Sequence, residues 1–377
     1  MTGAVGFGVF SDTGGPPRVG FRVGHGVVDL GAAGLGDVFA AASLNAFLAL
    51  GRPAWEDVVG RIGELVAAGV DVIPLEDTST HLPFDVADYV DFYSSLEHAT
   101  NLGRLFRPDA DPLLPNWRQL PVGYHGRAGT VVLSGTPIVR PCGQSKAPDE
   151  IDPRFGPSGR LDFELELGFV VGAGSPLGSP VAGSAFRDHV FGVALVNDWS
   201  ARDIQAWEYQ PLGPFLGKSF ATSIAAWITP LALLEDRFVP SPAQDPEPLP
   251  YLRVPGKWAL DVELEAEIAG TIVSRTNARG LYWTMPQQLA HATVNGASLR
   301  TGDLFVSGTI SGPEPGSEGS LIELTRNGAH PIRLGDGSTR TFLEDGDEVV
   351  LRGTAGEVEL AEVRGTLLPA TWGQPSG

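Results

Sequence analysis

Hydrophobic and polar residues alternate along the chain in short stretches that are separated by turns containing glycine or proline. A period of two is typical of β-strands with one buried face, and the turn residues limit the length of each strand. The strands predicted in this way cover residues 4–10, 18–23, 26–30, 161–171, 258–268, 301–309 and 319–324. Residues 190–196 are apolar throughout, which predicts a strand buried on both faces. The pattern therefore predicts a mainly β protein.

A helical period is found in fewer places. Residues 53–68 carry apolar side chains at every third or fourth position, which predicts an amphipathic helix. Residues 43–50 form a shorter candidate, and a third helix is expected to begin at a capping box made by Thr284 and Gln287. The front section up to residue 84 combines three strands with two helices, and we expect it to form a small domain.

One stretch, residues 91–101, follows neither period although it is rich in reactive side chains. Asp91, Tyr93 and His98 stand there with two serines, and turns with glycine and proline follow as far as residue 144. Because amphipathic packing would leave a period, we expect a loop that presents its side chains to a site. His98 is the group of this stretch that is suited to acid–base chemistry near neutral pH.

Three acids share one face of the predicted strand 161–171. Asp162, Glu164 and Glu166 alternate with apolar residues, so their side chains point the same way. Like charges in a row repel each other, so this face requires solvent or a cation, and the pattern alone favours solvent. Residues 258–268 carry outward acids in the same arrangement. Acids on a strand therefore do not by themselves define a site.

A further group of polar side chains follows the apolar strand. Asp198 stands at its end, and Arg202, Gln205 and Tyr209 come after it at helical spacing. A carboxylate, a guanidinium, an amide and a phenol would then converge just beyond one strand end. The turn-rich segment that follows contributes a single lysine, Lys218.

Charge and cysteine content narrow the class of protein. The formal net charge is −19, which argues against nucleic acid and anionic membranes as partners, because both bind basic surfaces. Cys142 is the only cysteine of the sequence, so an intramolecular disulfide and a zinc–thiolate cluster are excluded. The N-terminus lacks the regions of a signal peptide, and no apolar run has membrane-spanning length. We expect a soluble, cytoplasmic protein.

Standard catalytic motifs are missing from the sequence. It contains no nucleophile elbow, no phosphate-binding P-loop, no dinucleotide fingerprint and no zinc-protease motif. Carboxylates on turns and strand ends remain, and they suit a hard divalent cation such as Ca²⁺ or Mg²⁺ better than zinc. The residues alone favour a metal-dependent enzyme slightly over a non-catalytic binding module.

Several long, irregular motifs resemble the fumarylacetoacetate hydrolase family. They occupy residues 91–101, 114–117, 120–127, 134–137, 197–205, 207–209, 211–220, 282–285 and 307–312. The block Pro-Val-Gly-Tyr-His-Gly-Arg is the most specific of them, because the wider superfamily lacks it. The resemblance runs in order from about residue 88 to residue 348, with a looser match before it.

The resemblance implies a fold and an activity. The fold would be mainly β with some α: a small N-terminal SH3-like barrel domain over 1–84 and a larger C-terminal mixed β-roll, the catalytic domain, over 85–377. The protein would form a homodimer and act on a small diketo acid. Its reaction would be the hydrolysis of 4-fumarylacetoacetate to fumarate and acetoacetate, the last step of tyrosine and phenylalanine catabolism.

The resemblance also implies residue roles. The metal ligands would be Asp91, Glu164, Glu166 and Asp198, with Lys218 and Thr222 beside a second cation position. The catalytic group would comprise His98 as the base, Glu323 as its orienting partner, and Arg202, Gln205 and Lys218 around the oxyanion. The substrate contacts would be Tyr93, Arg107, Tyr124, Gln205, Tyr209 and Thr309. Asp162 would have no role.

Two other functions remain open. One is another reaction of the same superfamily, such as hydrolysis of a different acylpyruvate or decarboxylation of a keto acid. The other is metal-dependent binding of dicarboxylates without catalysis, which would not need His98 paired with Glu323. Tyr124, Tyr209 and Arg107 remain open between substrate contact and packing or dimer contact.

Overall fold

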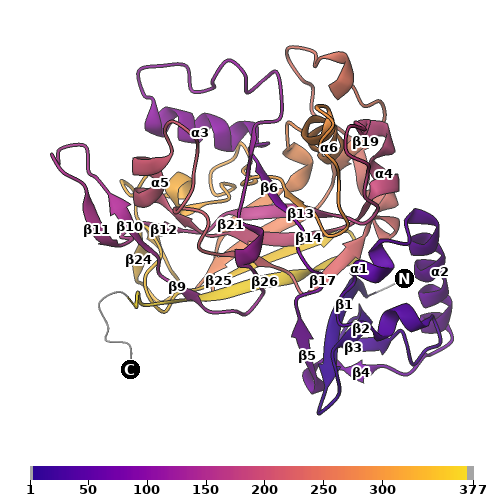
Figure 1. Cartoon of the computed structure of the whole chain (residues 1–377). Helices are drawn as coiled ribbons and strands as arrows, with labels where there is room; N and C mark the ends of the chain where they lie inside the picture. Colours follow the sequence, from indigo (N-terminus) through magenta and orange to yellow (C-terminus); the bar gives the residue numbers. More distant parts are fainter. Residues whose placement is uncertain (1–2, 372–377) are drawn as a thin grey trace.

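The computed structural model describes residues 3–371. The protein is 33% strand and 22% helix, which confirms the predicted class, mainly β with some α. Two sheets carry most of the strands, and the helices lie around them (Figure 1). Within the described residues, no helix has both the length and the apolar character that crossing a membrane requires.

The larger sheet has thirteen strands. Its main path is β4 (Ile73–Pro74), β3 (Gly26–Asp29), β2 (Arg18–Val23), β1 (Ala4–Asp12), β17 (Trp227–Pro230), β14 (Val190–Asp198), β13 (Leu165–Val171), β22 (Leu304–Val306), β6 (Tyr89–Phe92) and β7 (Gly123–His125). The branches are β5 (Thr78–His81) on β1, β16 (Thr222–Ile224) on β14, and β8 (Val131–Leu133) on β16. Strands of the front section are therefore hydrogen-bonded into one sheet with later strands.

The second sheet has five strands, and four strand pairs complete the β structure. The five strands are β21 (Thr271–Asn277), β20 (Glu263–Ile268), β25 (Glu348–Ala355), β26 (Val358–Leu368) and β9 (Ile138–Val139). The pairs are β10 (Cys142–Ser145) with β11 (Arg154–Pro157), β12 (Leu161–Asp162) with β15 (Ser200–Ala201), β18 (Phe238–Pro240) with β19 (Lys257–Leu260), and β23 (Ile332–Arg333) with β24 (Thr339–Arg340). β26 and β25 pack against β14, which places the main core between the two sheets.

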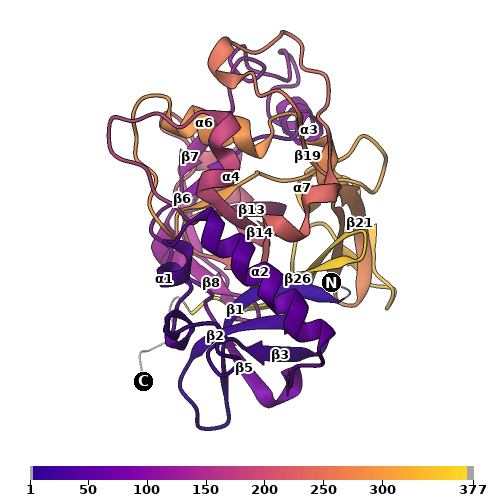
Figure 2. The ribbon, with the colours of Figure 1, turned by 90° about the vertical axis from the view of Figure 1, so that its right-hand side faces the viewer.

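Seven α-helices lie in the described part of the chain. They are α1 (Asn45–Leu48), α2 (Arg52–Ala67), α3 (Leu96–Phe106), α4 (Phe186–His189), α5 (Arg202–Glu208), α6 (Met285–Thr293) and α7 (Leu321–Leu324). Figure 2 shows α2 running along the front section, where it packs against α4. α3 and α5 lie at the other end of the molecule from the front strands (Figure 1).

The front section is attached to the rest of the molecule by a strand crossing and an aromatic cluster. β1 pairs antiparallel with β17, and a Cβ atom at Gly6 would lie 2.2 Å from the Ile228 carbonyl oxygen, so this crossing requires glycine. The rings of Phe7 and Trp55 lie 5.4 and 5.5 Å from that of Phe191 on β14. The predicted SH3-like closure of the section stays a prediction.

Most elements agree with the alternation and the helical period. β1, β2, β3, α2 and α6 occur where they were predicted, and α6 begins with the expected capping box. Turn residues delimit these strands, and an apolar stripe or a capping box marks the helices, so the local pattern is sufficient to predict them.

Two local predictions were wrong. Residues 91–101 do not form a loop: β6 ends at Phe92, and α3 begins at Leu96 after the Ser95 side chain accepts a hydrogen bond from the His98 backbone N–H at 3.3 Å. The polar residues hid the helical period because several of them face a buried site rather than solvent. The predicted strand 319–324 contains the short helix α7, whose first N–H groups are bound by a distant carboxylate.

Candidate active site

The end of the larger sheet brings four carboxylates together. Asp91 lies on β6, Glu166 on β13, Asp198 at the end of β14, and Glu164 immediately before β13. One oxygen of each carboxylate lies within 4.8 Å of the others, and all four residues are buried. The sheet order explains this meeting, because β14 and β13 are neighbours and β22 alone separates β13 from β6. Residues far apart in the sequence thus form one acidic cluster, defined by these four side chains.

The prediction from the strand pattern that Asp162, Glu164 and Glu166 face solvent was wrong. Their exposed fractions are 0%, 4% and 0%. Segments from later in the chain cover this face: Ser320 forms a β-bridge with Glu164, and the Leu165 N–H donates to the Gly319 carbonyl at 2.9 Å. By contrast, the acids of β20 are exposed or half-buried, as predicted.

Burial and mutual repulsion determine the charge of the acidic cluster. Burial, reinforced by the neighbouring carboxylates, raises the pKa of Asp91, Glu166 and Asp198 above the ordinary range. Burial also opposes ionisation of Glu164, but the cations of Lys218 and Arg202 outweigh it and lower the pKa of this carboxyl. The neighbouring cations thus favour the ionised form of Glu164, whereas burial and like charge oppose ionisation of the other three carboxyls.

The oxygen atoms of the acidic cluster fit a divalent cation. Among the described residues, both carboxylate oxygens of Glu166 and Oδ1 of Asp91 are buried without a hydrogen-bond partner. Buried polar atoms in proteins are almost always satisfied, so such oxygens call for a ligand. Carboxylate oxygens are the donors that hard divalent ions prefer. The site is therefore compatible with a divalent metal ion that all four carboxylates would hold.

Asp198 is held from three sides. The Lys218 ammonium donates to Asp198 Oδ2 at 2.8 Å and also contacts Glu164, while Thr222 Oγ1 donates to Asp198 Oδ1 at 3.1 Å. The Tyr124 hydroxyl donates to Asp198 Oδ2 at 3.2 Å. The structure thus brings Lys218, Thr222 and Tyr124 to the acidic cluster itself, where they fix the orientation of one carboxylate.

His98 and Glu323 form a buried pair. Nδ1 of His98 lies 2.6 Å from Oε2 of Glu323, although 225 residues separate them in the sequence. Glu323 also accepts hydrogen bonds from Asn101 at 3.0 Å, Ser311 at 2.9 Å and Ser320 at 2.7 Å. Burial alone would raise the pKa of Glu323, but its contact with His98 and the hydrogen bonds from Asn101 and Ser320 lower it below the ordinary value. An ionised Glu323 makes Nδ1 the proton donor, so Nε2 of the neutral ring is free to accept a proton.

Arg202 links three polar groups at the start of α5. Its Nη2 lies 2.7 Å from Glu164 Oε1, and its Nη1 donates to Gln205 Oε1 at 3.2 Å. The third contact, from Nε to Asp162 Oδ2, measures 2.8 Å. The predicted convergence of guanidinium and amide beyond the strand end is confirmed, and the Tyr209 side chain lies at the same cavity.

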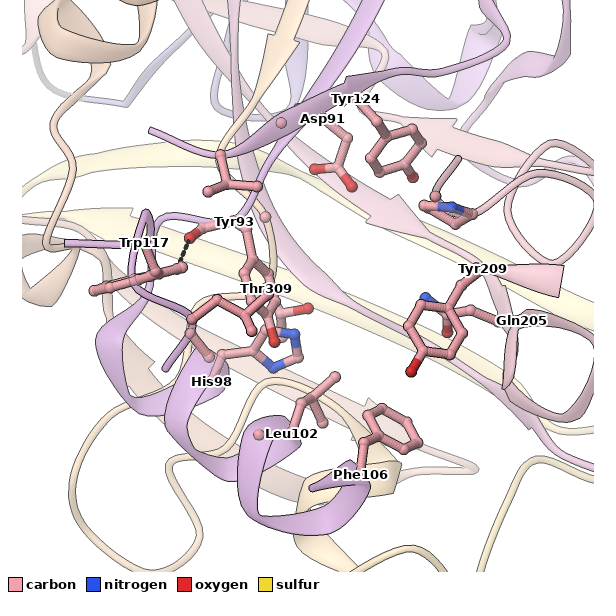
Figure 3. Close-up of a pocket in the computed structure, with 18 of the residues that line it drawn as sticks. Asp91, Tyr93, His98, Leu102, Phe106, Trp117, Tyr124, Gln205, Tyr209 and Thr309 are labelled. Carbon is pink, nitrogen blue, oxygen red and sulfur yellow. Dashed lines mark hydrogen bonds between the residues drawn. The ribbon is translucent and has the colours of Figure 1, made fainter. Parts of the chain in front are cut away.

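A cavity of about 410 Å³ joins these groups. Each predicted substrate-contact residue lines it: Tyr93, Arg107, Tyr124, Gln205, Tyr209 and Thr309. His98, Asp91, Glu164, Arg202 and Lys218 line it as well. Figure 3 shows Asp91 and Tyr124 on one side of the cavity, His98 beside Tyr93 and Thr309, and Gln205 and Tyr209 opposite. Leu102 and Phe106 form part of an apolar wall beside these polar groups, so the cavity suits a ligand that combines polar groups with an apolar stretch.

The sequence alone did not identify the residues that position Arg202 and the pair formed by His98 and Glu323. Asn101 and Ser320 stand three residues from His98 and Glu323, so the spacing offered a signal only once both segments were known to be helical. Ser311 and Asp162 gave no such signal, because their partners are remote in sequence.

Comparisons with known proteins agree with this fold and this site. The structure of a fumarylacetoacetate hydrolase from Exiguobacterium antarcticum superposes with a TM-score of 0.57 at 16% identity, covering 97% of this chain and 99% of that one. The likeness shows that both share the same fold class. Two family models also match: "Fumarylacetoacetase N-terminal" over residues 5–83 and "Fumarylacetoacetate (FAA) hydrolase C-terminal" over residues 88–365.

Sequence relatives are closer than the structural neighbour. The fumarylacetoacetase of Homo sapiens is 44% identical over 397 residues, which cover 97% of this chain and 95% of that protein. The enzyme of the same name from Caenorhabditis elegans is 48% identical over 357 residues, covering 89% and 85%. The chain belongs to the fumarylacetoacetase family.

Proposed function

We propose that the protein hydrolyses 4-fumarylacetoacetate to fumarate and acetoacetate. The observation that carries this proposal is the buried His98–Glu323 pair, which opens into the same cavity as the acidic cluster. A binder of dicarboxylates would need the cluster but not a histidine oriented by a buried carboxylate. The family relatives named fumarylacetoacetase support the choice of substrate.

The site residues divide the reaction among them. Nε2 of His98 takes a proton from water, whose oxygen forms a bond to the ketone carbon of the fumaryl group, the carbon that becomes a carboxyl of fumarate. Arg202, Gln205 and Lys218 stabilise the oxyanion that forms on this carbon, an effect worth roughly 3 kcal/mol per donor. The carbon–carbon bond then breaks, its electron pair leaves on the acetoacetate fragment as an enolate, and a proton returns to that carbon.

A divalent cation held by Asp91, Glu164, Glu166 and Asp198 would polarise the diketone and stabilise the enolate as a Lewis acid. We assign Ca²⁺ or Mg²⁺ to this position, because both prefer oxygen ligands. Lys218 and Thr222 would border a second cation position. Both side chains already contact the acidic cluster, which supports their place beside it.

The remaining parts of the proposal concern organisation. Residues 1–84 would form the N-terminal domain and residues 85–377 the catalytic domain, and the two family models meet between residues 83 and 88. The protein would act as a homodimer in the cytoplasm, in tyrosine and phenylalanine catabolism, with neither nucleic acid nor membrane as partner. The net charge of −19 supports the last point.

A spectrophotometric assay of fumarylacetoacetate tests the activity directly. We expect the wild-type protein to consume the substrate with equimolar formation of fumarate and acetoacetate, and a chelator to stop the reaction. Failure to consume substrate in the presence of added Mg²⁺ or Ca²⁺ would contradict the proposed function.

Arg107 is proposed to bind the distal carboxylate of the fumaryl arm. Its Nη2 donates to the Pro112 carbonyl at 2.7 Å, which holds the guanidinium at the cavity, while its buried Nε has no partner among the described residues. Arginine suits a carboxylate because it donates two parallel hydrogen bonds.

Arg107→Ala is expected to lower kcat/KM for fumarylacetoacetate by on the order of 10- to 100-fold, since a charged hydrogen bond contributes roughly 1.5–3 kcal/mol. An acylpyruvate without the distal carboxylate should lose much less. Arg104→Ala serves as the matched control, because Arg104 lies in the last turn of α3, which Arg107 follows directly, but is exposed. Equal losses for both substrates would show that Arg107 does not bind this carboxylate.

A further inference from the structure

Asp162 is a buried carboxylate to which the proposed reaction gives no part. Its side chain has an exposed fraction of 0%, and it does not line the substrate cavity. It stands on β12, two residues before Glu164, so the strand pattern placed it on the same face as two members of the acidic cluster. The contacts of its two oxygens nevertheless differ from those of Glu166.

Both oxygens of Asp162 are fully used by donors of the protein. Oδ1 accepts from the backbone N–H groups of Leu321 at 2.7 Å and Phe163 at 2.9 Å. Oδ2 accepts from the backbone N–H of Ile322 at 3.0 Å and from Arg202 Nε at 2.8 Å. All four partners are N–H donors, so the carboxylate offers no free oxygen to a cation. Glu166, with two unpartnered oxygens, has the opposite environment.

These four hydrogen bonds join two elements that carry the reaction. Arg202 begins α5, and its other two nitrogens reach Glu164 and Gln205. Leu321 and Ile322 begin α7, the helix that carries Glu323. One carboxylate therefore orients the arginine on one side of the cavity and the helical turn behind His98 on the other.

We propose that Asp162 is a positioning residue of the hydrolysis: it sets Arg202 and Glu323 relative to each other without touching the substrate. The inference rests on the proposed function, because it assigns Arg202 to the oxyanion and Glu323 to the base. Such groups act only when held close to the productive geometry by residues behind them. The acid that the family resemblance leaves without a role would thus couple the two halves of the site.

The test compares Asp162→Asn with Asp203→Asn. Asparagine keeps the shape of Asp162 but sets an NH₂ group against at least one N–H donor. Asp203 is the matched control, because it also lies at the start of α5 and accepts hydrogen bonds from Ser158 Oγ at 2.6 Å and the Gly159 N–H at 2.8 Å, away from the cavity. Both variants are expected to lower the melting temperature.

Only Asp162→Asn is expected to lower kcat, by on the order of 10- to 100-fold, as for other residues that orient groups in a site. Its KM should change by less than about threefold, because substrate contacts remain. In a Glu323→Gln background the same substitution should cost less than it does in the wild type, because the part of its effect that passes through Glu323 is already lost while the part through Arg202 remains. A wild-type kcat in folded Asp162→Asn, or fully additive losses in the double variant, would overturn the inference.

A second pair of variants decides the question if Asp162→Asn does not fold. Leu321→Pro removes one N–H donor to Asp162 at the first helical position, where proline is tolerated. Leu321→Ala removes comparable side-chain packing and keeps the N–H. We expect kcat of the proline variant to be at least about threefold below that of the alanine variant, and equal values would overturn the inference. If the wild type itself does not hydrolyse fumarylacetoacetate, the proposed function fails instead.

Discussion

Replacing His98 by alanine is expected to lower kcat by on the order of 100- to 10,000-fold, the range that general base catalysis contributes. His98 is the histidine that lines the cavity, and Glu323 holds its Nδ1 at 2.6 Å. Binding of product analogues such as fumarate should persist, because the substrate contacts and the acidic cluster remain. Single-turnover assays and equilibrium binding measure the two effects separately.

Two further variants serve as controls for this prediction: one at Glu323, the partner of His98, and one at an exposed histidine. Glu323→Gln is expected to lower kcat less than His98→Ala, since the base itself remains, and to change the pH–rate profile. His25→Ala should leave kcat unchanged, because His25 is exposed on the front section. Near-normal turnover by His98→Ala would show that His98 is not the general base. An unchanged profile in Glu323→Gln would show that the two residues do not act as a pair.

Removal of the metal ion is expected to abolish activity and to lower the melting temperature by about 3 °C, if the ion is present at on the order of 100 times its Kd. In the part of the chain that the structure describes, the four buried carboxylates of the acidic cluster form ion pairs with two cations, Lys218 and Arg202. Without a bound ion their repulsion and desolvation destabilise the fold, and binding removes this cost. Differential scanning calorimetry with and without chelator, alongside metal analysis, measures the shift.

Glu166→Gln is the variant that best distinguishes a metal site from an acidic cluster without an ion. Both Glu166 oxygens lack hydrogen-bond partners, and burial followed by the charge of Asp91 raises the pKa of this carboxyl. The neutral variant should be inactive, melt at or above the temperature of the metal-free wild type, and respond less to chelator. Glu263→Gln makes the same chemical change on the exposed face of β20 and should alter neither activity nor the response. If the melting temperature of the wild type does not change although metal analysis shows that the ion has been removed, the four-carboxylate site is contradicted.

Local sequence determined the elements that combine a clear side-chain period with clear signals at their ends. β1, β2 and β3 are delimited by turn residues, α2 by its apolar stripe, and α6 by the box of Thr284 and Gln287. For such elements the period of the side chains and the caps are sufficient, because both depend on neighbours within a few residues. The irregular motifs also identified the family and, with it, the candidate site residues.

Only the tertiary structure decided the environment of the polar faces. The pattern presents Asp162, Glu164 and Glu166 as equivalent, but the fold satisfies Asp162 with four N–H donors and leaves both oxygens of Glu166 unpartnered. The difference comes from α7, which lies 159 residues further along the chain from Asp162 and supplies two of the donors. In the same way His98 acquires its partner from 225 residues away. Alternation shows that a strand face is polar; whether that face meets water, a cation or a fixed hydrogen-bond donor depends on which remote segment packs over it.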